Sequence, residues 1–276
     1  ASWACPNPAE EAARSEPVVI TEHKGAALWV TIAREERRNA INPQVIAGIE
    51  AALHQAAATP GVRALVLTGQ GDKAFCAGAD LTRGTGVFTD GAQEPTTDFG
   101  RLARAAHGMG LPLIARVNGA CVAGGMGLLA LCDLAVAADH ARFGLPEGKV
   151  GVFPMQVLVY LRRLVAPRHV NHLCLTGELI GAQRAMEIGL VNEVVAADQL
   201  DARVQALVDQ VAQLSPMALS RGKYAMAAME HMAFHEALAF AETQIAVASN
   251  TADAREGLAA FNEKRPPAWT VRGAGQ

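Results

Sequence analysis

The chain has 276 residues, of which 51% are hydrophobic and 18% are charged. This composition excludes wholesale disorder and suffices for one large core, alone or with an appended region. The net charge of −3 and the pI near 6.3 provide no basic surplus, so we expect no nucleic-acid partner.

The cysteines are odd in number, widely spaced and without a C-x-x-C pair, which argues against a disulfide framework or a zinc site. The histidines show no ligand spacing, so no metal is expected. The N-terminus lacks the basic and apolar regions of a signal peptide. The most apolar stretch, residues 111–138, is interrupted by Arg116, Asn118 and Asp133, which favours buried strand and helix over a membrane span. We therefore expect a cytoplasmic protein with reduced thiols and no membrane partner.

The first third of the chain alternates strand and helix signals. Residues 1–16 show neither the helical nor the strand periodicity of apolar residues and are predicted to be a flexible tail. Strands are predicted at 18–22 and 28–33. Asn42 and Pro43 then form the N-cap and first-turn pair of a helix with one apolar face. The pattern therefore begins as a layered α/β structure.

The alternation continues to about residue 195. The predicted elements are a strand at 64–68, a long glycine-rich loop at 69–100, a helix near 99–107, a strand at 113–117, a helix at 124–132 and a strand at 134–137. Helical periodicity follows at 182–188, 198–214 and 217–261. We therefore expect a tail (1–16), an α/β core (17–194) and a C-terminal helical region (195–276).

Two glycine-rich turns lie where a strand passes into a helix. They run from Lys73 to Leu81 and from Val117 to Leu129. Glycine and alanine let main-chain N–H groups face a ligand, and a helix N-terminus adds unpaired donors. Two such donors on one carbonyl oxygen would stabilise an enolate. The alternative is an ordinary pair of tight turns. The glycines fit neither G-x-G-x-x-G nor a G-K-S/T phosphate loop.

The ordered blocks around these turns resemble the crotonase (enoyl-CoA hydratase/isomerase) superfamily, from about Ala33 to Trp269. The blocks are Arg34-Glu-Glu-Arg-Arg-Asn-Ala-Ile41, Ala74-Phe-Cys-Ala-Gly-Ala-Asp80, Asn118-Gly-Ala-Cys-Val-Ala-Gly-Gly-Met-Gly127, Phe143-Gly-Leu-Pro-Glu147 and Leu175-Thr-Gly-Glu178. The resemblance implies a spiral of ββα units. It also implies a C-terminal helical region that forms a homotrimer, commonly assembled into a hexamer as a dimer of trimers.

The resemblance also implies roles for particular residues. The N–H groups of Ala79 and Gly124 would form an oxyanion hole for the carbonyl of an acyl-CoA thioester, with coenzyme A present as part of the substrate and no separate cofactor. The implied coenzyme A contacts are Arg37, Arg38, the backbone around Ala40 and Ala77, the turn ending at Asp80, and Lys264, on the same or a neighbouring subunit. The alternative for the basic residues is a solvated surface.

The expected acid/base chemistry rests on one carboxylate. Hydratases of the superfamily use two glutamates; Glu147 matches the second, and Gly127 stands where the first is expected. One base can move a proton between Cα and Cγ, which fits a 3,2-enoyl-CoA isomerase, while hydration stays open. Partial burial should raise the pKa of Glu147 and suit it to proton transfer. The alternative is a solvated loop carboxylate.

The remaining candidate site residues each have a functional and a structural interpretation. Phe153 and Met155 are predicted to shape the acyl pocket or to pack in the core. Cys76 and Cys121 are interpreted as small buried hydrophobes, and Asp133 as a structural hydrogen-bonding group. Three loop acids are either solvated or a second acid: Asp90, Glu94 and Asp98. The predicted function is that of an enoyl-CoA hydratase/isomerase; the alternatives are a malonyl-type acyl-CoA decarboxylase and a non-catalytic acyl-CoA binding protein.

Overall fold

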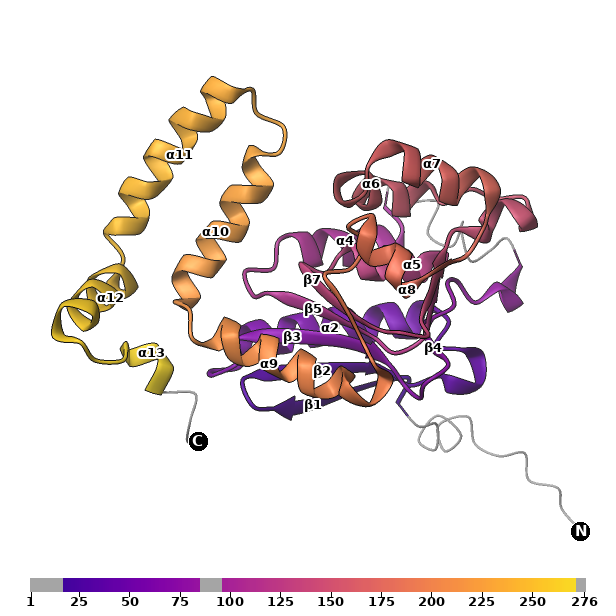
Figure 1. The fold of residues 1–276 in the computed structure, drawn as a ribbon, viewed down its shortest axis with the longest axis horizontal. Helices are drawn as coiled ribbons and strands as arrows, with labels where there is room; N and C mark the ends of the chain where they lie inside the picture. The colour runs from indigo at the N-terminus through magenta and orange to yellow at the C-terminus, as the bar shows by residue number, and fades with distance from the viewer. Residues whose placement is uncertain (1–16, 85–95, 272–276) are drawn as a thin grey trace, which may run out of the picture.

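The computed structural model describes residues 17–84 and 96–271, so the predicted tail and the loop acids Asp90 and Glu94 lie outside the described residues. Two sheets run through this part of the chain (Figure 1). The larger has the strand order β1 (Val19–Lys24), β2 (Ala27–Ile32), β3 (Ala64–Gly69), β5 (Leu113–Val117), β7 (Leu134–Ala138) and β10 (Glu193–Val195). Only its β1–β2 pairing is antiparallel; the other pairs are parallel.

The smaller sheet is built from short strands, and all but β9 directly follow a strand of the larger sheet. Its order is β4 (Ala74–Cys76), β6 (Ala120–Val122), β8 (Arg142–Gly144) and β9 (Ile180–Gly181). Thus β3 leads to β4, β5 to β6 and β7 to β8, with helical segments after each pair. This repeat is the predicted spiral of ββα units, and it confirms the α/β class.

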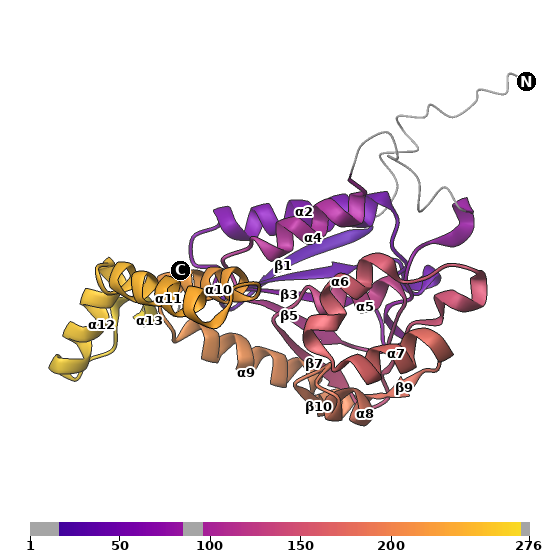
Figure 2. The same ribbon diagram turned by 90° about the horizontal axis from the view of Figure 1, so that it is seen from above.

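Helices cover both faces of the larger sheet. In Figure 2, α2 (Pro43–Ala58) and α4 (Asp98–His107) lie on one face and α9 (Leu200–Ala212) lies on the other. Side chains of β2 alternate accordingly: Leu28 and Val30 belong to the core under α2 and α4, and Trp29 belongs to the core under α9. A strand buried on both faces is continuously apolar, which is how β2 and β3 read in the sequence.

Local signals set several element boundaries. The side chain of Asn42 accepts a hydrogen bond of 2.8 Å from the backbone N–H of Val45, which confirms the predicted start of α2. β5 has the predicted bounds. The helix predicted for 124–132 is α5 (Gly124–Ala130). Asp98 is not in the loop where it was expected, because Thr97 caps α4 and makes Asp98 its first residue, paired with Arg101 at 2.8 Å.

The remaining described helices lie between the elements given above or follow them in the chain. They are α6 (Met155–Leu164), α7 (Pro167–Thr176), α8 (Ala182–Glu187), α10 (Pro216–Met229), α11 (Phe234–Ser249), α12 (Ala252–Glu263) and α13 (Ala268–Val271), with the 3-10 helices η1 (Glu35–Arg37), η2 (Leu81–Arg83), η3 (Pro146–Val150) and η4 (Ala197–Gln199). Figure 1 shows α10, α11 and α12 extending from the core as an arm. Across residues 17–84 and 96–271, no helix combines the length and apolar character needed to cross a membrane. The division near residue 195 stays a prediction.

Candidate active site

The first glycine turn is held against the segment that follows η1. Ile41 and Ala79 form a parallel β-bridge, in which the N–H of Ile41 donates to the carbonyl of Gly78 (2.7 Å) and the N–H of Asp80 donates to the carbonyl of Ile41 (2.8 Å). In a parallel bridge the residue between these two bonds directs its own N–H away from the partner segment. The N–H of Ala79 is therefore directed away from Ile41.

The second turn meets the first through its smallest residues. A Cβ added at Gly78, whose φ is +92°, would lie 2.7 Å from Cβ of Ala123 and 3.2 Å from the backbone N of Gly124. A Cβ added at Gly124 would lie 3.5 Å from the backbone N of Ala79. Only glycine at residue 78 permits this approach of the two backbones. The contact brings the backbone nitrogens of Ala79 and Gly124 close together.

The backbone before Gly124 is strained. Ala123 has φ 51° and ψ −125°, a conformation that a non-glycine residue adopts at a cost of about 1–3 kcal/mol. Its N–H donates to the carbonyl of Gly144 at 3.0 Å, which holds the residue in place. Gly124 is the first residue of α5, so its N–H has no intrahelical acceptor. Within the described residues, neither Gly124 nor Ala79 donates a backbone hydrogen bond.

A side-chain network supports the first turn. Arg34 donates to the carboxylate of Asp80 at 2.7 Å and to the carbonyl of Ala40 at 2.6 Å. Hydrogen bonds from Arg34 and then from Thr82 lower the pKa of Asp80 to about 2. Asn39, buried with φ 56°, donates to the carbonyl of Ala74 at 2.7 Å. No local sequence signal predicts roles for the side chains of Arg34 and Asn39, because their partners are 46 and 35 residues away.

Glu147 lies in η3, three residues after the strand that contacts the second turn. Its side chain is half-buried, and Oε2 is fully buried without a hydrogen-bond partner among the described residues. Desolvation raises the pKa of this carboxyl above its usual value. The alternative of a solvated loop carboxylate is therefore wrong. A partly desolvated carboxyl with an elevated pKa is better suited than a solvated one to accept and return a proton.

The cysteines beside the turns are structural. Cys76 and Cys121 are fully buried, and burial raises the pKa of Cys76 to about 12 and that of Cys121 well above its usual value. Both are packed hydrophobes, as predicted.

Asp133 accepts a hydrogen bond from the backbone N–H of Leu113 at 2.7 Å and pairs with Lys223 of α10, which confirms its structural role.

Most of the predicted coenzyme A residues come together at the first turn. The N–H of Ala77 donates to the carbonyl of Arg38 at 3.0 Å, next to Ala40, and the side chains of Arg37 and Arg38 are exposed. The carboxylate of Asp80 forms an ion pair with Arg34. These positions suit a ligand on this surface, but the contacts themselves stay a prediction.

Lys264 is not brought to the turns within one chain. It caps the C-terminus of α12, and α12 lies at the opposite end of the molecule from β4 (Figure 1). Phe153 and Met155 are 38% and 69% exposed, so core packing is wrong for both. Their place in an acyl pocket stays a prediction.

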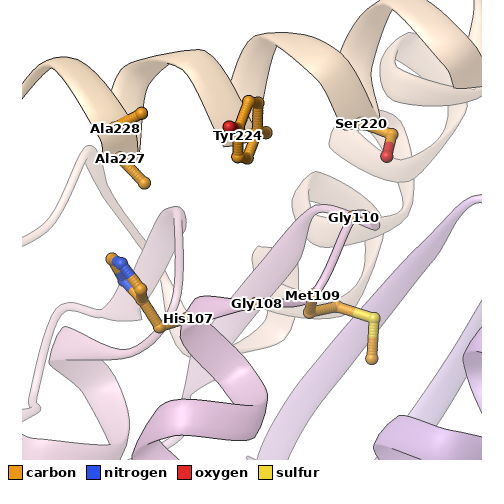
Figure 3. A pocket seen from close by; sticks show the side chains of 8 residues that line it. All are labelled: His107, Gly108, Met109, Gly110, Ser220, Tyr224, Ala227 and Ala228. Atoms are coloured by element: carbon orange, nitrogen blue, oxygen red, sulfur yellow. The ribbon is translucent and has the colours of Figure 1, made fainter.

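A separate cavity of about 360 Å³ lies between α4 and α10 (Figure 3). It is lined by His107, Gly108, Met109, Gly110, Ser220, Tyr224, Ala227 and Ala228. None of these residues belongs to the two turns or to η3, so this cavity is not the site built above. Within the described part of the chain, no group of three or more His, Cys, Asp or Glu side chains is arranged to hold a metal ion.

The fold and the two apposed turns define a protein of the crotonase superfamily. The family model for enoyl-CoA hydratase/isomerase matches residues 22–272, and the chain belongs to this family. A Thermus thermophilus relative with a provisional enoyl-CoA hydratase name is 37% identical over 252 residues, covering 90% of this chain and 99% of that protein.

Two further similarities agree with this membership. The crotonyl-CoA hydratase of Syntrophomonas wolfei is 32% identical over 249 residues, covering 90% of this chain and 95% of that protein. The crystal structure of an enoyl-CoA hydratase from Mycobacterium smegmatis superposes with a TM-score of 0.83 at 33% identity, covering 92% of this chain and 99% of that one. The likeness therefore extends over nearly the whole chain.

Proposed function

We propose that this chain is an enzyme that isomerises or hydrates an enoyl-CoA thioester through an enolate, with Glu147 as the general acid/base. One observation carries the proposal: a half-buried carboxyl with a raised pKa follows the strand that supports Gly124, whose N–H adjoins that of Ala79. Relatives named as hydratases of CoA esters support the substrate class. Coenzyme A enters as part of the substrate, and no separate cofactor is required.

The two N–H groups would donate to the thioester oxygen and stabilise the negative charge that develops there. Loss of one such donor typically raises the barrier by about 3 kcal/mol. In isomerisation, Glu147 removes a proton from Cα of a 3-enoyl-CoA, and the C–H electron pair becomes the C1=Cα bond of the enolate while the carbonyl π electrons move onto the thioester oxygen. When the carbonyl re-forms, the C1=Cα electron pair becomes the Cα=Cβ bond, and the electrons of the Cβ=Cγ bond take the proton at Cγ from Glu147. One carboxyl serves both transfers.

The coenzyme A moiety would lie on the surface next to the first turn. Arg37 and Arg38 offer exposed guanidinium groups to phosphates, and the backbone of Ala40 and Ala77 would meet the adenine. Asp80 would contribute to coenzyme A binding indirectly, as the last residue of the turn that contacts the ligand. Lys264 would reach the phosphates from a neighbouring subunit, while Phe153 and Met155 would contact the acyl group.

Self-association through the C-terminal arm is part of the proposal. Neither α10 nor α11 buries a residue within one chain. The arm exposes large apolar side chains, namely Tyr224 (59%), Met226 (65%), Phe234 (74%), Ile245 (68%), Leu258 (64%) and Phe261 (81%). Large exposed apolar side chains gathered on one arm favour a protein interface. A homotrimer, or a hexamer made of two trimers, would cover it. Cytoplasmic location and the absence of nucleic-acid and membrane partners stay predictions.

The test is a panel of 2-enoyl-, 3-enoyl- and malonyl-CoA substrates with the wild type and Glu147→Gln. Turnover of an enoyl-CoA that drops about 100-fold or more in Glu147→Gln would support the mechanism. Turnover unaffected by the substitution would overturn it. Loss of CO₂ from malonyl-CoA alone would indicate a decarboxylase, and tight binding without turnover would indicate a non-catalytic acyl-CoA binding protein.

A further inference from the structure

An aromatic ring occupies the space beside α5, one turn after the N–H of Gly124. A Cβ added at Gly127 would lie 2.7 Å from Cζ of Phe99 and 3.2 Å from Cγ2 of Val157. No real Cβ sits that close to a ring carbon, so Gly127 and Phe99 are matched: the ring lies where any side chain at residue 127 would begin. Sequence spacing did not indicate this pair, because residues 99 and 127 belong to different elements.

The segment that carries the ring is tied to α6. Thr97 caps α4 by accepting a hydrogen bond from the N–H of Gly100 (3.0 Å), and the side chain of Gln156 donates to the same hydroxyl at 2.5 Å. The start of α4 is thereby tied to the start of α6, next to Val157. Phe99 is partly buried and packs against the main core.

The position of this pair relates it to the site. Gly124 and Gly127 are three residues apart on α5, about 4.5 Å along the helix axis and on the same face. The wall made by Phe99, Gly127 and Val157 is apolar and offers no hydrogen-bond partner to water. Glu147, by contrast, is a carboxyl on η3. Among the described residues, the atoms nearest to a Cβ at Gly127 are therefore carbons of Phe99 and Val157, and neither side chain carries an acid or a polar group.

We propose that Phe99 is a specificity-determining residue that directs the site toward isomerisation and against hydration. This inference rests on the proposed function. Hydration forms an O–C bond at Cβ and breaks the Cα=Cβ π bond; one proton leaves the water for a carboxylate and another is delivered to Cα. A bound water thus needs a polar position beside the enolate. The ring of Phe99 fills that position with carbon, so the single carboxyl returns its proton to the substrate.

The experiment measures the ratio of 3-hydroxyacyl-CoA to isomerised enoyl-CoA formed from 3-hexenoyl-CoA. The variants are Phe99→Ala, Phe99→Leu, Gly127→Glu and Phe99→Ala/Gly127→Glu. The double variant is expected to raise the ratio at least tenfold, since it supplies both room and a carboxyl. Phe99→Leu keeps apolar bulk and is expected to change the ratio less than twofold. Gly127→Glu alone is expected to lower the melting temperature without raising the ratio, because the ring occupies its Cβ position.

Two results would overturn the inference: a folded double variant with the wild-type ratio, or Gly127→Glu alone raising the ratio as far as the double variant. If the double variant does not fold, Phe99→Ala decides: a threefold rise supports the inference and an unchanged ratio overturns it. Failure of the proposed function is distinct, because it shows in the wild type as absence of any turnover that depends on Glu147. In that case this inference falls with it.

Discussion

The guanidinium of Arg34 and the carboxylate of Asp80 form an ion pair at 2.7 Å whose side chains are only 12% and 11% exposed. The same guanidinium donates to the carbonyl of Ala40. Arg34 thus connects the segment after β2 to the turn that presents Ala79. This connection makes the geometry of the proposed oxyanion hole depend on a side chain that does not itself belong to it.

We predict that Arg34→Lys lowers both stability and activity. Lysine keeps the charge but lacks the fork that reaches Asp80 and Ala40 together. The loss is expected to be about 2 kcal/mol of unfolding free energy, measured by urea denaturation. A misplaced donor should also lower kcat by about 10-fold or more. Arg101→Lys, which alters an exposed pair with Asp98, is the matched control, and equal losses in both variants would contradict the assignment.

The loss of unfolding free energy at low pH should depend on the ionisation of Asp80. Its pKa in the folded protein is about 2, below the unfolded value of about 3.9. A depressed carboxyl pKa contributes stability that is fully present above the unfolded value and is lost as pH falls through the folded value. We therefore expect Asp80→Asn to cost stability at pH 5 and progressively less between about pH 4 and pH 2. A difference that does not shrink in this window, measured by chemical denaturation, would exclude Asp80 as the source.

Glu147 should change the stability of the folded protein with pH in the direction opposite to Asp80. Its folded pKa is raised, so the group favours the folded state when protonated, and this contribution is lost as pH rises through the folded pKa. Glu147→Gln is expected to melt higher than the wild type at pH 8, with a gap that narrows as pH falls. Activity should instead drop about 100- to 10,000-fold. Thermal scans across pH test the first statement; a wild type that is equally stable at pH 8 would contradict it.

Because the two turns approach closely at Gly78, a substitution there should lower activity in a way that a substitution at another positive-φ glycine does not. Gly78→Ala should lose activity as well as stability, because its Cβ would lie 2.7 Å from Cβ of Ala123. Gly61→Ala is the control: Gly61 also has positive φ, +86°, but a Cβ there meets nothing within 4 Å. The backbone strain alone is expected to cost about 1–2 kcal/mol in either variant. Steady-state kinetics should separate them, and unchanged kcat in Gly78→Ala would refute the turn contact.

The proposed assembly predicts that apolar residues of the arm hold subunits together. Phe234→Ser/Ile245→Ser removes two exposed side chains that make no core contact in one chain. Sedimentation velocity is expected to show trimers or hexamers for the wild type and smaller species for the variant. Val159→Ser, which changes an exposed apolar residue on α6, should leave the sedimentation coefficient unchanged. A monomeric wild type would rule out the arm as a stable interface.

Local chemistry in the sequence was enough for much of this structure. The Asn42–Pro43 pair determines the start of α2, continuous apolar runs determine the central strands, and small residues mark both turns, because these signals act over a few residues. The ordered blocks were sufficient to predict the family. They also located Glu147, although its burial was an expectation until the fold showed it.

Tertiary structure alone decided the relationships between distant segments. Pairing of Arg34 with Asp80 and the ring of Phe99 over Gly127 join residues 46 and 28 positions apart along the chain. The apposition of Ala79 and Gly124 was expected only from the family resemblance. No periodicity encodes such contacts, since they arise when the sheet brings successive ββα units side by side. The sequence identified Gly127 as a missing carboxylate; the folded chain shows that an aromatic side chain has taken its space.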